Sequence, residues 1–274
     1  MNRNDYIASL LASNSAHYQW DEEPVFCLSS DVDWASEDVM ESYFQKMLSY
    51  KQRATLFLTH QSDRIDKVFS KNLIDRGIHP NFMEKSSHGN SFKEVAETCV
   101  KYAPESYGFR SHRAFDVTDI THMLYNDYGY RYVSNQITIL QPMIRPILHE
   151  SGLVNYPVFF EDGTHLYNQL DLSIEPYKRL FVSPGLKILS FHPMNYVFNS
   201  PSYHYMRSIK DSLTREQFNN IDKQTISRLQ NRNRGIRDFI DDLVEFITIK
   251  GFTWLSMNEM YHTFKGEHSE RAGN

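Results

Sequence analysis

Two aspartates, Asp31 and Asp33, stand where the first strongly hydrophobic run of the chain ends, and their spacing suits metal chemistry. In an extended chain, residues i and i+2 point to the same side, so both carboxylates would enter one site. Two carboxylates that close repel each other unless a cation or a cationic side chain joins them. The pair therefore indicates a site where one aspartate binds a metal ion and the other acts as a base. The alternative is a helix cap or a solvated strand end.

Two histidines, His79 and His112, follow later hydrophobic runs at equivalent places. One aspartate and two histidines are a common ligand set for Zn²⁺ and similar ions, in sites that keep positions open for water. We therefore take Asp33, His79 and His112 as the candidate metal ligands. His88, which lies in a Ser/Gly-rich loop, is the rival of His112. A lone histidine such as His79 can also be purely structural.

Hydrophobic periodicity predicts the strands and helices that must position these residues. The predicted strands are 24–31, 54–59, 77–82, 107–112, 130–135, 153–160, 186–192 and 251–256. The predicted helices are 36–50 with Ser36 as its N-cap, 62–76, 91–103, one capped by Asp116, and a long helix marked by apolar residues from Ile236 to Ile247. Segment 136–152 is expected to be irregular, and the polar segment 199–222 is expected to run over the surface.

Strands that alternate with helices place the chain in the α/β class with a parallel sheet. A closed or nearly closed barrel fits 274 residues as one domain. We expect a core over residues 24–256 and flexible ends, including the last residues, GEHSERAGN. The carboxyl ends of the strands in such a barrel meet on one face, so side chains far apart in sequence would share one site.

Composition and motifs exclude several other functions. The net charge of −5 has the wrong sign for a general nucleic-acid binder. The chain has no Gly-x-Ser-x-Gly elbow, Walker loop or dinucleotide-binding glycine motif. Cys27 and Cys99 both lie in apolar runs and are expected in the core. No apolar run is long enough to span a membrane, and the short apolar stretch from Tyr6 to Ala12 makes a poor signal peptide, so we expect a cytoplasmic protein.

Four segments carry a resemblance to a known family: SSDVDWA, GIHPNF, FRSHRAF and SFHPMNYVFN. Their order over residues 24–256 resembles the NodB-type polysaccharide deacetylases, carbohydrate esterase family 4, and the segments look closer still to a WbmS-like branch linked to lipopolysaccharide and O-antigen clusters. The resemblance implies a distorted (β/α) barrel of about seven parallel strands and a divalent metal, with Zn²⁺ the first choice. It also implies hydrolysis of an N-acetyl or similar acyl group.

The resemblance also implies roles for individual residues. Asp31 matches the catalytic base, and Asp33 the metal-binding aspartate. Arg110 matches the arginine that orients the base, and His192 the late histidine that acts as general acid. His79 falls at the place of the first metal-binding histidine.

The chain departs from the family pattern at two places. Met83 stands where the second histidine is expected, four residues after the first. The usual Arg-x-Pro-Tyr motif is replaced by Arg110-Ser111-His112-Arg113. The third ligand must therefore come from elsewhere, and we favour His112.

Two further residues, Trp34 and Asp162, are candidate substrate contacts. Trp34 lies beside the aspartate pair and could stack on a sugar ring, although core packing is equally open. Asp162 belongs to a polar cluster with Glu161 and His165, which could contact sugar hydroxyls, tune His192 or form a solvated turn. The expected partner is an acylated amino sugar or glycan, with no nucleic acid, no membrane span and no readable protein partner. The alternative function is a catalytically inactive glycan- or sugar-nucleotide-binding protein with the same fold.

Overall fold

The computed structural model describes residues 16–266, so the predictions about the N-terminal apolar stretch and the C-terminal tail lie outside the described residues. The described chain folds around a ten-stranded sheet. Its strands are β1 (Pro24–Asp31), β2 (Ala54–Leu58), β3 (Ile74–Ile78), β4 (Gly108–Phe109), β5 (Tyr132–Val133), β6 (Ile147–Leu148), β7 (Val154–Asn155), β8 (Val158–Glu161), β9 (Gly185–Phe191) and β10 (Thr253–Trp254).

The sheet is curled, and nearly all of its strands are parallel. Its order is β6-β7-β5-β4-β3-β2-β1-β9-β8, with β10 paired to β1. Only β6 runs antiparallel to its neighbour, β7. The segment that follows β5 is hydrogen-bonded to β8, the last strand in this order. The N–H groups of Thr138 and Leu140 donate to the carbonyls of Val158 and Phe159. This curled α/β sheet confirms the predicted fold class, a distorted (β/α) barrel.

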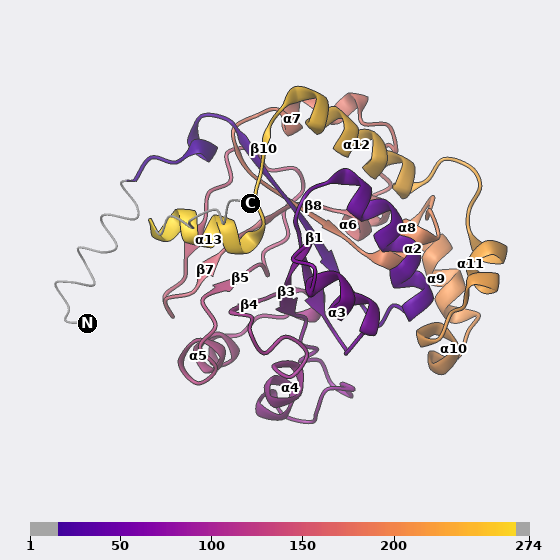
Figure 1. Cartoon of the computed structure of the whole chain (residues 1–274), viewed down its shortest axis with the longest axis horizontal. Coiled ribbons are helices and arrows are strands. Elements are labelled where there is room, and N and C mark those ends of the chain that lie inside the picture. The colour runs from indigo at the N-terminus through magenta and orange to yellow at the C-terminus, as the bar shows by residue number, and fades with distance from the viewer. Residues whose placement is uncertain (1–15, 267–274) are drawn as a thin grey trace.

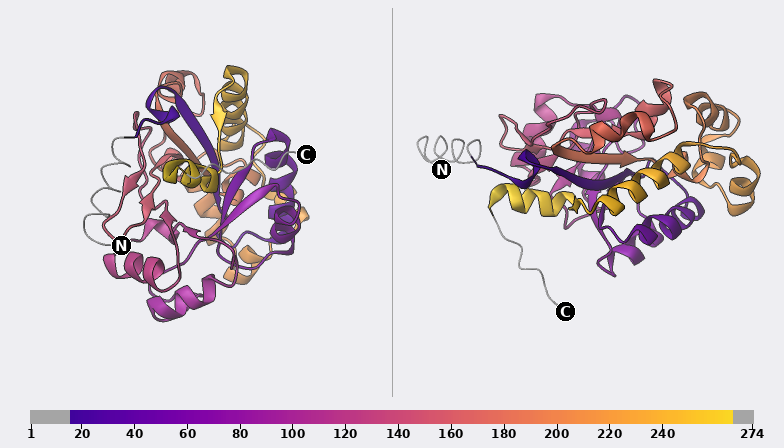
Figure 2. Two further views of the ribbon diagram at one scale, coloured as in Figure 1. Left: turned by 60° about the vertical axis from the view of Figure 1, so that its left-hand side comes forward. Right: turned by 90° about the horizontal axis from the view of Figure 1, so that it is seen from above.

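Helices surround the sheet on the outside, as Figure 1 shows. They are α2 (Glu37–Met47), α3 (Asp63–Phe69), α4 (Phe92–Cys99), α5 (Thr118–Asn126), α6 (Asp162–Tyr167), α7 (Lys178–Phe181), α8 (Pro193–Val197), α9 (Tyr203–Asp211), α10 (Arg215–Asn219), α11 (Lys223–Leu229), α12 (Ile236–Lys250) and α13 (Met257–Lys265). In Figure 2, α9 to α11 lie together at one end of the molecule. Among the described residues, no helix has the length and apolar character needed to cross a membrane.

The central strand β1 is continuous and wholly buried, as its hydrophobic sequence predicts. All eight of its residues are buried, because β2 and β9 flank it and helices cover the sheet. The helix that follows starts as predicted. The hydroxyl of Ser36 accepts a hydrogen bond from the N–H of Val39, and Glu37 and Asp38 occupy the first turn. The buried strand before Asp31 and the capped helix after Asp33 therefore fix both ends of the segment that carries the two aspartates.

The prediction of one helix over residues 62–76 is wrong. The helix α3 ends at Phe69, and Asn72 takes a left-handed conformation with φ of 57°. Strand β3 then starts at Ile74 and pairs with β2, so the strand predicted over 77–82 starts earlier and ends at Ile78. Pairing with β2 decides the conformation of residues 74–76, where helical spacing alone misleads.

Four further predictions need correction or refinement. Helix α5 has Val117, not Asp116, at its N-cap and makes no side-chain cap bond. The run 153–160 forms two strands rather than one, since β7 pairs with β5 while β8 pairs with β9. The segment 199–222 does run over the surface, but it contains the two helices α9 and α10, and segment 136–152 contains the short strand β6.

Candidate active site

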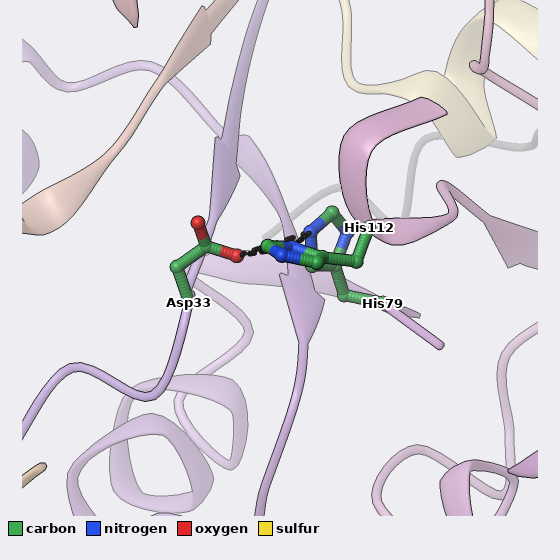
Figure 3. Close-up of side chains that lie close together, drawn as sticks. All are labelled: Asp33, His79 and His112. Carbon is green, nitrogen blue, oxygen red and sulfur yellow. Dashed lines mark hydrogen bonds and ion pairs between the residues drawn. The ribbon is translucent and has the colours of Figure 1, made fainter. Parts of the chain in front are cut away.

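The side chains of Asp33, His79 and His112 converge at the carboxyl ends of β1, β3 and β4 (Figure 3). Oδ1 of Asp33 lies 3.2 Å from Nε2 of His79 and 3.0 Å from Nδ1 of His112. The two ring nitrogens are 3.4 Å apart. One atom from each residue thus lies within 4.8 Å of the others, and the donor set of one carboxylate and two imidazoles suits Zn²⁺ or a similar ion.

A strained turn aims the Asp33 carboxylate at these rings. Asp33 and Trp34 both have left-handed backbones, with φ of 47° and 56°. Residues other than glycine rarely adopt this conformation, and two in succession are costly unless the surroundings hold them. The Trp34 N–H donates to the Thr59 hydroxyl at 2.9 Å, and the Ala35 N–H donates to the Val32 carbonyl at 3.0 Å. Asp33 therefore reaches the site through a turn beyond β1, and not through strand alternation with Asp31.

The rival ligand, His88, is occupied elsewhere in the fold. Its Nε2 lies 2.8 Å from the Thr59 carbonyl, and its Nδ1 accepts the Asn81 N–H at 3.1 Å. The buried Cys99 thiol lies 3.2 Å from the same Nδ1. Both ring nitrogens thus hold the loop together, whereas His112 faces Asp33 and His79. The geometry favours His112 as the third ligand.

His79 has one ring nitrogen with no hydrogen bond from the described residues. Its Nδ1 is buried, and the nearest carboxylate oxygen, Oδ1 of Asp31, is 4.0 Å away. The side chain is only 2 % exposed, so the ring is enclosed without being anchored by the backbone. A structural histidine is normally satisfied by such bonds. This arrangement fits a ligand better than a packing residue.

The second centre of the site is the ion pair between Asp31 and Arg110, both of which are buried. Nη1 of Arg110 donates to Oδ1 of Asp31 at 2.8 Å. The rest of the guanidinium bonds to hydroxyls of Ser29, Ser134 and Ser190, and to the Ser134 carbonyl. Burial alone would raise the pKa of the Asp31 carboxyl, but Arg110 and the nearby histidines hold this pKa below its usual range. Asp31 is therefore kept ionised and fixed in orientation.

The serines that hold Arg110 are functional residues that sequence reasoning missed. Ser29 and Ser190 lie inside the buried, mainly apolar strands β1 and β9, and Ser134 directly follows β5. A small polar residue within a buried strand must find a hydrogen-bond partner. That requirement is the sequence signal that would have pointed to a buried charged group in the barrel.

The third centre is His192, at the end of β9, with Asp162 and Glu161 at the end of β8. Nδ1 of His192 lies 2.5 Å from Oδ1 of Asp162 and 3.4 Å from Oε1 of Glu161. Burial lowers the pKa of His192, but the carboxylates of Asp162, Glu161 and Asp33 outweigh it, so the pKa lies well above its usual value. Nε2 of His192 lies 3.8 Å from Asp33, so the free nitrogen is turned toward the three candidate ligands.

The polar cluster predicted after β8 divides into separate roles. Asp162 is fully buried, and its oxygens accept from the N–H groups of His192 and Gly163, so it has no surface to offer a substrate. Glu161 is the N-cap of α6, and its carboxylate accepts a hydrogen bond from the Thr164 N–H. Burial raises the pKa of this carboxyl group. Nε2 of His165 lies 2.9 Å from the Asp171 carbonyl. Of the uses considered for this cluster, orientation of His192 is the one that the geometry favours for Asp162.

A cleft of about 630 Å³ opens above these centres. Asp33, Trp34, His112, Glu161 and His192 line its inner end. The Trp34 ring lies 5.5 Å from the His88 ring and meets the His112 ring edge-on at 5.2 Å. Trp34 is thus half-buried between two histidines while part of it faces the cleft, which fits both packing and contact with a sugar ring.

Comparison with known proteins identifies the family. The family model described as "WbmS-like: Polysaccharide deacetylase" matches residues 28–210, and the chain belongs to this family. A solved structure from Bordetella bronchiseptica, described as a polysaccharide deacetylase involved in O-antigen biosynthesis, is similar with a TM-score of 0.70 and 25% identity. The match covers 81% of this chain and 90% of that one. The predicted resemblance is therefore confirmed.

More distant likenesses are weaker. A CE4 family pseudoenzyme from Bacillus anthracis has a TM-score of 0.45 and 11% identity, covering 88% of this chain and 66% of that one. A peptidoglycan deacetylase from Bacillus subtilis has a TM-score of 0.44 and 10% identity, covering 90% and 94%. No match was found among curated proteins.

Proposed function

We propose that the protein is a metal-dependent deacetylase that hydrolyses the N-acetyl, or a similar N-acyl, group of an amino sugar in surface-polysaccharide biosynthesis. The observation that carries the proposal is that three centres adjoin one another: the Asp33–His79–His112 group, the Asp31–Arg110 pair and the His192–Asp162 pair. Oδ1 of Asp31 lies 4.0 Å from His79, and Nε2 of His192 lies 3.8 Å from Asp33. Family membership supports the deacetylase class. The O-antigen description of the similar Bordetella protein supports the type of pathway.

Asp33, His79 and His112 would hold a divalent ion, with Zn²⁺ the first choice from the donor set. A bound ion of this kind supplies Lewis-acid chemistry, which polarises a carbonyl and lowers the pKa of water. Asp31, ionised and clamped by Arg110, accepts the proton from the attacking water. Arg110 itself carries no proton to the reaction, because all of its contacts hold it in the barrel wall.

His192 protonates the departing amine nitrogen. Its raised pKa keeps the imidazole protonated near neutral pH, and its Nε2 is the nitrogen turned toward the cleft. Without this proton the nitrogen is a poor leaving group, and the adduct would expel the oxygen that came from water and return to the starting amide. A well-placed acid typically contributes about 10²–10⁴-fold in rate. Trp34 stacks on the sugar at the inner end of the cleft, beside His112.

The test is release of acetate from N-acetylated amino sugars by the purified protein supplied with Zn²⁺, Co²⁺ or Mn²⁺. His192→Ala should keep its metal and its fold but lose about 10²–10⁴-fold in turnover. His149→Ala, at a histidine outside the three centres, serves as the matched control. Sugar binding without any acyl release, with every metal tried, would reject the hydrolase and support the alternative of a glycan-binding protein.

A further inference from the structure

The outer wall of the cleft is formed by one face of α9. Tyr203, Met206, Arg207 and Lys210 all line the cleft, and their spacing of i, i+3, i+4 and i+7 places them on one side of a helix. The residue that α9 buries in the core is Ile209, outside this set. This helix therefore turns a mixed aromatic and basic face toward the same space that holds Asp33, His112 and His192.

Positive charge gathers around this outer part of the cleft. Its lining includes five cationic side chains, Lys85, Arg113, Arg207, Lys210 and Arg215. The lining has three acidic residues, and two of them, Asp33 and Glu161, belong to the catalytic end. The whole chain carries a net charge of −5, so this local excess of cations opposes the overall balance. A charged cleft of this kind attracts ligands of the opposite sign.

Most of these cations are uncommitted within the protein. Across residues 16–266, Arg207 pairs with Asp211 at 3.0 Å, and Nζ of Lys210 lies 5.6 Å from the centre of the Phe218 ring. Within the same range, Lys85, Arg113, Lys210 and Arg215 have no ion pair. Arg113 directly follows the candidate ligand His112, and a left-handed backbone with φ of 58° turns it out of the fold. Four charges that no acidic side chain among residues 16–266 neutralises at the mouth of this cleft are available to an anion.

We propose that this cleft binds a substrate that carries an anionic group, a carboxylate or a phosphate, beside its acylated amino group. That the anion is part of the reacting substrate rests on the function proposed above, whereas the cleft's preference for anions does not. The apolar faces of Tyr203 and Met206 contact the sugar, while Lys210 and Arg215 neutralise the anion. The inner end of the cleft then receives the acylamino group.

The test measures binding by isothermal titration calorimetry to the zinc-loaded full chain. The probes are N-acetylglucosamine, N-acetylglucosamine 1-phosphate and N-acetylglucosaminuronic acid. At least one anionic probe should bind about tenfold or more tightly than the neutral sugar, and its affinity should fall as salt is raised, because the contacts are solvent-exposed ion pairs. Tighter binding of the phosphate alone would assign a phosphorylated substrate, and of the uronate alone a carboxylated one.

Charge variants show whether the outer wall causes the preference. The double variant Lys210→Gln/Arg215→Gln should lose about tenfold of the anionic advantage, since each exposed charge contact contributes only a few-fold. The matched control, Lys71→Gln/Arg179→Gln, removes the same two charge types at exposed positions away from the cleft and should keep the preference. An anion bound only to the metal would be equally tight in both double variants.

Two results would overturn the proposal: equal binding of neutral and anionic probes, or an anionic preference that survives Lys210→Gln/Arg215→Gln unchanged. Loss of the hydrolase function is a separate outcome. If no acyl group is released from any probe, yet anionic sugars still bind through the outer wall, the anion site stands while the proposed reaction falls.

Discussion

The two oxygens of the Asp162 carboxylate contact His192 at two points. Its Oδ1 lies 2.5 Å from Nδ1 of the imidazole, and its Oδ2 accepts the backbone N–H of His192 at 2.8 Å. The first contact fixes which ring nitrogen carries the proton, and the second fixes the strand end that bears the ring. One fully buried side chain therefore sets the position of the proposed acid, and together with Glu161 and Asp33 it raises the pKa of the imidazole.

Asp162→Asn should lower turnover and move the alkaline limb of the pH–rate profile to lower pH. The carboxylate raises the pKa of His192, so its removal lets the imidazole lose its proton at a lower pH. The loss in rate should not exceed the about 10²–10⁴-fold that an acid contributes. Metal content should be unchanged, and Asp127→Asn, at an exposed position, serves as the control. A slower enzyme with an unshifted profile would mean that Asp162 only supports the fold.

His112→Ala and His88→Ala should separate metal binding from structural support. Loss of His112 removes a candidate ligand and should weaken metal affinity by more than the about 10–100-fold typical of residues behind the ligands. Loss of His88 breaks buried bonds to Thr59 and Asn81 and should cost about 1–3 kcal/mol in the free energy of unfolding, with metal retained. Elemental analysis and chelator competition measure the first effect, and urea unfolding the second. The reverse pattern would assign His88 as the ligand.

Arg110→Met should destabilise the protein by about 3–5 kcal/mol, because the buried Asp31 carboxylate loses its partner. In the native protein the folded pKa of Asp31 is lowered, so its ionisation adds stability above the unfolded pKa, and this is lost as pH falls. In the variant, burial dominates and raises that pKa, so ionisation now opposes folding. The deficit should therefore be larger at about pH 7 than at about pH 4 in urea unfolding. A deficit independent of pH would show that packing, and not the ion pair, is lost.

Lys187 gives a test of the fold that does not involve the active site. It lies near the start of β9, fully buried, with Nζ 3.1 Å from the Pro184 carbonyl, and burial lowers its pKa from 10.5 to about 8. Between these values the unfolded chain holds a proton that the folded chain has released, so stability rises with pH.

Lys187→Met should remove that rise. Relative to wild type, the variant should gain stability at about pH 7 by on the order of 3 kcal/mol at most, and the gain should vanish toward about pH 10.5. Urea unfolding at both values measures the difference, and Lys71→Met, at an exposed lysine, is the control. A constant difference across this range would show that burial does not lower the pKa of Lys187.

The central strands were predictable because burial leaves a simple pattern. The run from Pro24 to Asp31 is mostly apolar and continuous, and so is Gly185 to Phe191, apart from Lys187 and Ser190; the two pair in parallel register. Residues 74–76 (Ile-Asp-Arg) have no such pattern. Arg53 pairs with Asp75 at 2.6 Å, and Arg76 with Glu105 at 2.8 Å, so these charged side chains are satisfied by contacts distant in sequence. Such contacts decide strand over helix and are invisible to local periodicity.

The candidate site was predictable where residue type carries the chemistry, as for Asp33, His79 and His112. The choice between His112 and His88 was not, because it depends on whether a ring is tied to the backbone. The sequence left the role of Asp162 open among sugar contact, tuning of His192 and a solvated turn, because the contact that decides it is with a residue 30 positions later in the chain. The sequence did not predict the outer wall that α9 forms. Segment 199–222 shows no apolar stripe that would indicate a helix there.

The left-handed turn at Asp33 and Trp34 limits which mutations this place can accept. Aspartate and asparagine are among the few non-glycine residues that tolerate this conformation, whereas β-branched residues do not. A lineage that loses the carboxylate here should therefore pass to asparagine or glycine more readily than to alanine, valine or threonine. The same bias makes Asp33→Asn the laboratory exchange that removes the negative charge while leaving the loop's shape intact.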